Sequence, residues 1–201
     1  MYVARILYPV HVLGPGERIG IWFCGCEHHC KGCSNPELWE QQERYRTSAD
    51  TVMGLIHQIC RTHAVDGFTL TGGDPFYQPE ALAKLLPALS AISDDILVYT
   101  GYDYSDVKWK YPKLMAQIGV LVDGKYLEQR NTGAVIRGSD NQNILILQEH
   151  LVDRYQSYLE SAVNEIENFT TVDGIISVGI HRPGYDARMD ALLRQKGLES
   201  R

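Results

Sequence analysis

The sequence predicts an α/β protein built on a parallel sheet, either an α/β layer or an incomplete βα barrel. Strand-like and helix-like patterns alternate along the first two-thirds of the 201 residues, which favours parallel strands joined by crossover helices. The strand-like runs are almost continuously apolar, as in a sheet that helices cover on both faces. With 44% hydrophobic and 22% charged residues, the chain is a folded globular protein rather than a disordered one.

The individual elements follow from spacing and from end signals. Apolar residues at Val52, Leu55 and Ile56 have helical spacing, with Ser48 or Asp50 as the candidate N-cap. A later helix begins at Pro79, where the missing N–H has no cost. The predicted order is a strand over 18–24, a helix over 49–63, a strand over 67–71, a helix over 79–90, a strand over 96–100, a helix over 104–117 and a strand over 119–122.

The carboxyl ends of these strands carry polar or glycine-rich segments. In parallel sheets, functional groups gather beyond that edge. We therefore expect the site to combine the segments that follow the four strands: Cys24-Gly25-Cys26, Thr71-Gly72-Gly73-Asp74, Thr100-Gly101-Tyr102 and Asp123-Gly124-Lys125.

The last quarter of the chain predicts an α/β extension. A long helix is expected after Leu147, with apolar side chains from Leu151 to Ile166, then a strand over 174–180 and a helix over 185–196. No repeat, low-complexity stretch or linker separates the parts. We divide the chain into a core, 1–148, and a C-terminal extension, 149–201, that packs on the core as part of a single domain.

Composition excludes several classes of protein. A net charge of −6 offers no cationic surplus for a nucleic-acid backbone. Apolar runs such as 144–147 and 175–180 are far shorter than the roughly 20 residues that span a bilayer. The N-terminus has no signal-peptide pattern. We expect a cytoplasmic protein without nucleic-acid or membrane partners.

Four of the five cysteines, Cys24, Cys26, Cys30 and Cys33, lie within ten positions, which favours a metal site over a disulfide framework. Thiolates select iron–sulfur clusters, zinc or Cu(I). Electron-carrying [4Fe–4S] sites use four cysteines, so three would leave one iron open for chemistry. The alternative is a zinc site closed by Cys24, His28 or His29. We interpret Cys24 and Cys60 as packing residues and the two histidines as loop residues.

The cysteine spacing and the segments after it resemble a known family. Cys26-x3-Cys30-x2-Cys33 followed by Gly72-Gly73-Asp74-Pro75 resembles the radical S-adenosylmethionine superfamily, and more narrowly the activating enzymes of anaerobic ribonucleotide reductase. The resemblance runs through residues 14–148. The narrower likeness is carried by Gly25 to Asn35 with Trp39, Tyr99-Thr100-Gly101-Tyr102, Leu121 to Tyr126, and Arg137-Gly138-Ser139-Asp140-Asn141-Gln142.

The resemblance implies an enzyme with a defined fold, cofactors and partners. Cys26, Cys30 and Cys33 would hold a [4Fe–4S] cluster whose open iron binds S-adenosylmethionine, in a partial βα barrel of the radical S-adenosylmethionine type. A 5′-deoxyadenosyl radical would abstract a glycine Cα hydrogen on the large glycyl-radical subunit of the reductase. Reduced flavodoxin or a similar small carrier would donate the electron.

Cofactor contacts are implied at two further places. The turn Gly72, Gly73, Asp74 and Pro75 would meet the methionyl amine, with Thr100 lining the same site. The alternative, an ordinary turn capped by Asp74, is favoured only where no cysteine motif accompanies the turn. Gly32, Cys33 and Ser34 would face the nucleoside. Gly32 and Ser34 replace aromatic residues that are common at those positions in the family. Arg137 and Asn141 would orient a ligand or stabilise their loop.

Two other functions remain open. A radical S-adenosylmethionine enzyme of this size could activate another glycyl-radical enzyme or modify a peptide or small molecule, and residues 149–201 give this reading weight. A non-catalytic zinc-binding or electron-transfer module is the alternative from a different class.

Overall fold

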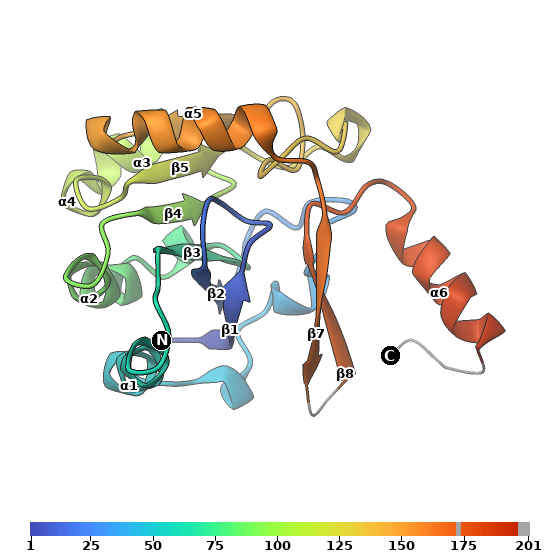
Figure 1. Ribbon diagram of the computed structural model, residues 1–201, viewed down its shortest axis with the longest axis horizontal. Coiled ribbons are helices and arrows are strands. Elements are labelled where there is room, and N and C mark those ends of the chain that lie inside the picture. Colours follow the sequence, from blue (N-terminus) through green and yellow to red (C-terminus); the bar gives the residue numbers. More distant parts are fainter. Residues whose placement is uncertain (172–173, 197–201) are drawn as a thin grey trace.

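A six-stranded, mostly parallel sheet forms the centre of the molecule in a computed structural model that describes residues 1–171 and 174–196 (Figure 1). The strands lie side by side in chain order: β1 (Val3–Val10), β2 (Arg18–Phe23), β3 (Gly67–Gly72), β4 (Ile96–Tyr99), β5 (Val120–Asp123) and β6 (Asn143–Ile146). The pairs from β2 to β5 are parallel, which confirms the predicted α/β class.

Both edge strands are antiparallel to their neighbours, and neither was predicted. β1 pairs with β2, and β6 pairs with β5. Strict alternation of strand and helix therefore holds only for the four central strands. Each edge strand is joined to its neighbour by a connection without an α-helix, residues 11–17 for β1–β2 and 124–142 for β5–β6, and an antiparallel pair needs no crossover helix.

Helices cover one face of the sheet. α1 (Ala49–Cys60), α2 (Pro79–Ser90), α3 (Tyr104–Lys110) and α4 (Pro112–Met115) bury apolar side chains against this face. Side chains alternate between faces along β4: Ile96 and Val98 join this core, whereas Leu97 belongs to the opposite one. Ser48 caps α1 by accepting a hydrogen bond from the Thr51 amide at 3.0 Å.

The helix predicted over 104–117 is divided into α3 and α4. Tyr111 precedes Pro112 and leaves helical geometry, with φ −130° and ψ 53°. A proline ring disfavours the helical conformation of the residue before it. The single long helix was therefore wrong at a position that the sequence itself marks.

The opposite face is covered by the C-terminal elements (Figure 1). α5 (Val152–Ser161) packs Leu151 and Tyr155 against β4 and β5. The hairpin of β7 (Ile166–Thr171) and β8 (Gly174–Gly179) lies at the β1–β2 side, and α6 (Tyr185–Gln195) follows. The long helix predicted to reach Ile166 was wrong, because the backbone is extended at Ala162 and Ile166 begins β7.

A buried ion pair joins these layers. Arg18 of β2 and Asp95, just before β4, are 0% and 2% exposed, and their side chains lie 3.0 Å apart. Tyr155 of α5 donates a hydrogen bond to Asp95 at 2.6 Å. Because burial of an unpaired charge is costly, this network fixes α5 against the sheet.

Within the described part of the chain, the structure contains no helix that is both long and apolar enough to cross a membrane.

Candidate iron–sulfur and cofactor site

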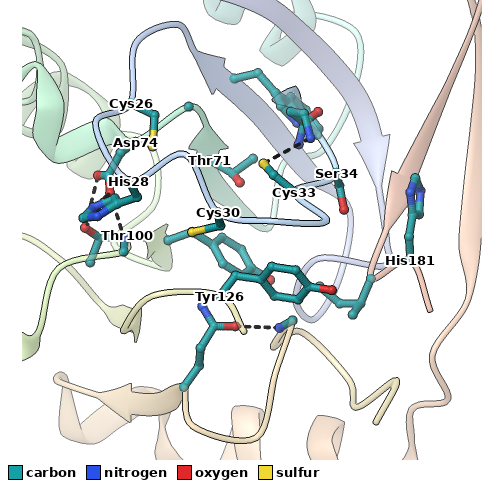
Figure 2. Close-up of a pocket in the computed structure, with 18 of the residues that line it drawn as sticks. Cys26, His28, Cys30, Cys33, Ser34, Thr71, Asp74, Thr100, Tyr126 and His181 are labelled. Atoms are coloured by element: carbon teal, nitrogen blue, oxygen red, sulfur yellow. Dashed lines mark hydrogen bonds and ion pairs between the residues drawn. The ribbon is translucent and has the colours of Figure 1, made fainter. Parts of the chain in front are cut away.

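A cavity lies beyond the carboxyl ends of the parallel strands, where the sequence placed the site (Figure 2). The loop after β2 brings three cysteines to its wall, and the exits of β3 and β4 supply the rest of that side. The predicted site residues that line the cavity are Cys26, Cys30, Cys33, Ser34, Gly73, Asp74 and Thr100. Three predicted residues, Gly32, Gly72 and Pro75, are outside this lining, and their contact with a cofactor stays a prediction.

The three cysteines are free thiols in partly buried positions. Burial raises the pKa of the Cys26 thiol to about 11, and hydrogen bonds from the His28 and His29 backbone oppose this shift. Burial likewise raises the pKa of Cys30 and Cys33. A metal requires the thiolate form, so binding would have to release these protons.

Hydrogen-bond donors point at all three sulfurs. The Asn35 amide lies 3.4 Å from the Cys33 sulfur, and the Trp39 side chain favours the same thiolate. A hydrogen bond from the Tyr126 backbone likewise favours the thiolate form of Cys30. Donors of this kind stabilise and tune iron–sulfur clusters. The residues present therefore fit a cluster held by three thiolates.

Among residues 1–171 and 174–196, no three His, Cys, Asp or Glu side chains converge as the ligands of a single metal ion do. The cysteines of a cluster need not converge in this way, because each binds a different iron.

Cys24 is not in the cavity. Its side chain is 0% exposed, and its thiol donates a hydrogen bond to the Glu40 carbonyl at 2.9 Å. Cys60 packs at the margin of the helix-covered core. Both positions agree with the packing roles predicted for these cysteines.

The Gly72-Gly73 turn brings β3 against the start of the cysteine loop. A Cβ atom on Gly72 would lie 2.4 Å from the Phe23 carbonyl oxygen, and one on Gly73 would lie 2.4 Å from that of Gly25. The Gly73 and Asp74 amides donate hydrogen bonds to these same two carbonyls, both at 2.8 Å. Only glycine permits this close approach.

Asp74 connects three segments of the site. Its carboxylate is buried and accepts hydrogen bonds from the Phe76 amide at 2.9 Å, the Gly101 amide at 2.8 Å and the Thr100 hydroxyl at 3.0 Å. The turn-capping role is therefore present, and the same carboxylate borders the cavity. Thr100 lines the cavity as well and donates its hydroxyl hydrogen to this carboxylate.

His28 completes the connection between the cysteine loop and the strand exits. Its Nε2 lies 3.1 Å from the Asp74 carboxylate, and its ring packs edge-on against Tyr102 at 4.5 Å between centroids. Gly101 leaves room for the ring, since a Cβ there would lie 2.4 Å from it. His29, in contrast, is half exposed beside Trp39.

The loop over 125–142 closes another side of the cavity. Arg137 pairs with Asp140 at 3.2 Å, and Asn141 donates to the Lys125 carbonyl at 2.7 Å, so both side chains stabilise the loop. Gln142 lines the cavity while it bonds to the Gly138 amide and the Gly124 carbonyl, each at 2.8 Å.

Sequence reasoning missed part of the wall. Residues 177–181 of β8 and its exit line the same cavity, together with Tyr126 and Asn131. Tyr126 ends one of the segments that carry the family resemblance, but no motif marks residues 177–181, because their position depends on how the hairpin packs. Only the strand pattern of β8 was visible in the sequence.

A cavity walled by three free, hydrogen-bonded thiols defines an iron–sulfur class of site. In agreement, the family model described as "4Fe-4S single cluster domain" matches residues 12–145.

Curated relatives make the comparison more specific. The anaerobic ribonucleoside-triphosphate reductase-activating protein of Enterobacteria phage T4 is 34% identical over 143 residues, which covers 69% of this chain and 90% of the phage protein. The protein of the same name from Vibrio cholerae is 34% identical over 145 residues, covering 68% and 93%. That of Escherichia coli K12 is 32% identical over 143 residues, covering 67% and 92%. The chain therefore belongs to the family of these activating proteins, which confirms the resemblance seen in its motifs.

Proposed function

We propose that this protein is a radical S-adenosylmethionine enzyme that activates an anaerobic ribonucleoside-triphosphate reductase. The observation that carries the proposal is the single cavity that Cys26, Cys30 and Cys33 share with Asp74 and Thr100 at the strand exits. Relatives that bear the activating-protein name support the choice of substrate protein.

Cys26, Cys30 and Cys33 would hold a [4Fe–4S] cluster through their thiolates, each on a different iron. Such a cluster would supply one electron for the reductive cleavage of the S-adenosylmethionine C–S bond, which gives methionine and a 5′-deoxyadenosyl radical. With three protein ligands, one iron would stay open for S-adenosylmethionine. Backbone amides directed at the sulfurs stabilise the negative charge of the thiolates.

The chain positions the methionyl end through its buried carboxylate. Asp74 places negative charge at the cavity wall, which favours a protonated amine nearby. Its hydrogen bonds to Thr100 and Gly101 fix the β4 exit relative to the glycine turn. Leu13, Trp22 and Val178 give the cavity an apolar wall, which limits access of water.

The hydrogen atom would be taken from a glycine Cα on the large reductase subunit, which would leave a backbone glycyl radical on that subunit and 5′-deoxyadenosine as the second product. We propose that the sheet is a partial βα barrel of the radical S-adenosylmethionine type, because residues 1–171 and 174–196 contain four parallel strands, β2 to β5, and eight would close a barrel. Its open side would admit the substrate loop.

Other assignments belong to the same proposal. We assign the protein to the cytoplasm and reduced flavodoxin, or a similar carrier, to electron donation. Residues 1–148 form the core and 149–201 the extension of one domain, a division supported by the family match over 12–145 and by the Tyr155–Asp95 contact. Positions 172–173 and 197–201 of that extension lie outside the described residues.

The test combines the anaerobically reconstituted protein with S-adenosylmethionine, a one-electron reductant and the large reductase subunit. Electron paramagnetic resonance is expected to detect a glycyl radical on the reductase, and a Cys30→Ala variant should give none. If 5′-deoxyadenosine forms but the reductase gains no radical, the substrate assignment is overturned. In that case another glycyl-radical enzyme, a peptide or a small molecule is the target, as the extension beyond residue 145 allows.

A further inference from the structure

The C-terminal hairpin is built into the wall of the cavity. Val178 of β8 is 3% exposed and packs in an apolar cluster with Leu13 and Trp22. This cluster also contains Cys24, at the start of the cysteine loop. The hairpin is therefore anchored to the segments that carry the site.

The exit of β8 is held by side chains from two other segments. Asn164 donates a hydrogen bond to the Ile180 carbonyl at 2.9 Å, and Asn131 donates one to the His181 carbonyl at 2.7 Å. Asn131 also donates to the Tyr126 hydroxyl at 3.1 Å, and the Tyr126 backbone contacts the Cys30 sulfur. A chain of contacts thus joins the β8 exit to a cysteine of the motif.

The hairpin wall and the cofactor turn occupy different parts of the cavity. In Figure 2, His28, Asp74 and Thr100 group on one side of the view, whereas His181 lies on the other with Ser34 near it. Residues 177–181 line this second part. Polar groups that suit an amine are therefore at one end, and the hairpin is at the other.

On the side of the cavity lined by residues 177–181, the cysteine motif offers no apolar side chains to a ligand. Gly32 has no side chain, and Ser34 has only a small polar one. Val178 of β8, Ile180 just after it and Leu13, which belongs to the same apolar cluster, present apolar groups instead. A flat purine ring gains binding energy from such walls.

The hairpin lies outside the matched region of the family. The family model ends at residue 145, and the alignment with the phage T4 relative already covers 90% of that protein. Too little of the relative remains to supply an extension as long as residues 149–201. This wall is accordingly a feature of the present chain rather than of these shorter proteins.

We infer that the β8 exit, through Ile180 and its neighbours, forms the binding wall for the nucleoside part of S-adenosylmethionine. The inference rests on the proposed function, and it adds a contact that lies outside the cysteine and glycine motifs. The methionyl part would depend on the cluster and on the Asp74 end, and the nucleoside on the hairpin.

The experiment measures equilibrium binding of S-adenosylmethionine and of methionine to the full-length, cluster-loaded protein. Ile180→Ala is expected to raise the dissociation constant for S-adenosylmethionine about tenfold or more, because three CH₂ equivalents of a partly buried side chain are lost. Ile180→Val should give a smaller rise. Methionine binding and iron content should stay unchanged. Ile175→Ala is the matched control, since Ile175 is on the same strand but is 68% exposed and is not in the lining.

The graded Ile180 series keeps the test independent of folding, because Ile180→Val removes one methylene only. Equal S-adenosylmethionine affinity in wild type and both Ile180 variants would overturn the inference. So would a loss of reductase binding without any change in S-adenosylmethionine affinity, since the wall would then serve the protein substrate. If the wild-type protein itself binds no S-adenosylmethionine, the proposed function fails as well.

Discussion

His28, between Cys26 and Cys30 in the loop after β2, lies 3.1 Å from the carboxylate of Asp74 on the glycine turn after β3. The two residues are 46 positions apart in the chain. Their contact joins the loop that would hold the cluster to the turn that would hold the methionyl group. The His28 side chain is 13% exposed and that of Asp74 is 2% exposed, so water competes little for this interaction.

We predict that His28→Leu weakens S-adenosylmethionine binding without removing the cluster. A hydrogen bond to a charged group contributes about 1.5–3 kcal/mol, so the KM for S-adenosylmethionine should rise about tenfold or more. The kcat and the iron content should change much less. His28→Gln keeps a donor and should restore part of the affinity.

His29→Leu is the matched control for this series, because His29 adjoins His28 and its side chain is 50% exposed. The positioning role would be disproved by equal KM values for His28→Leu and His29→Leu. Binding and kinetic measurements on the same preparations separate the two outcomes.

The cysteine assignment predicts a selective loss of iron. Cys26→Ser, Cys30→Ser and Cys33→Ser should each lose most of the bound iron and the brown colour after anaerobic reconstitution. Cys24→Ser and Cys60→Ser should keep both, since these side chains pack away from the cavity. Iron analysis and visible absorption provide the readout. Loss of the metal in Cys24→Ser would instead make Cys24 a fourth ligand.

Asp74 is predicted to stabilise the apoprotein as well as the site. Asp74→Ala leaves the buried Thr100 hydroxyl and the amides of Phe76 and Gly101 without their acceptor. The free energy of unfolding should fall by about 2–4 kcal/mol, measured by urea denaturation. Asp103→Ala, at an exposed residue whose side chain makes no capping bond, should cost no more than about 0.5 kcal/mol. Equal effects would contradict the account of Asp74.

The sequence was informative where local chemistry carries the signal. The spacing of the cysteines, the Gly72-Gly73 turn and the polar strand exits all predicted one working edge, and these segments do border one cavity. Ser48 as a helix cap was likewise readable from residue type. Pro112 was an equally local signal, and the break that it causes in the predicted helix was overlooked.

The features that the sequence did not predict depend on packing between segments that are far apart in the chain. No crossover helix connects β1 or β6 to its neighbour, so the strand–helix alternation did not predict either strand. In the sequence, β6 is only a short apolar run. Nothing near residues 177–181 indicates that they face a loop about 150 positions earlier. Their place follows from Val178 packing against Trp22, a contact that no sequence period encodes.

The contact between α5 and the sheet, made by Tyr155 and Asp95, gives a separate prediction about stability. Tyr155→Phe removes the 2.6 Å hydrogen bond to Asp95, whose carboxyl group lies 3.0 Å from the Arg18 guanidinium. Because the acceptor is a buried member of an ion pair, the free energy of unfolding should fall by about 1.5–3 kcal/mol in urea titrations. Tyr158→Phe is the control, since that hydroxyl donates a 3.2 Å bond to the His11 carbonyl near the surface, and its loss should cost less than about 1 kcal/mol.

The most direct test of the proposed chemistry is the product of S-adenosylmethionine after reduction of the reconstituted protein without oxygen. Equal amounts of 5′-deoxyadenosine and methionine are expected from the wild-type chain, and none from Cys26→Ala, Cys30→Ala or Cys33→Ala. A colourless, zinc-loaded protein that leaves S-adenosylmethionine intact, or cysteine variants that still cleave it at the parent rate, would contradict the account.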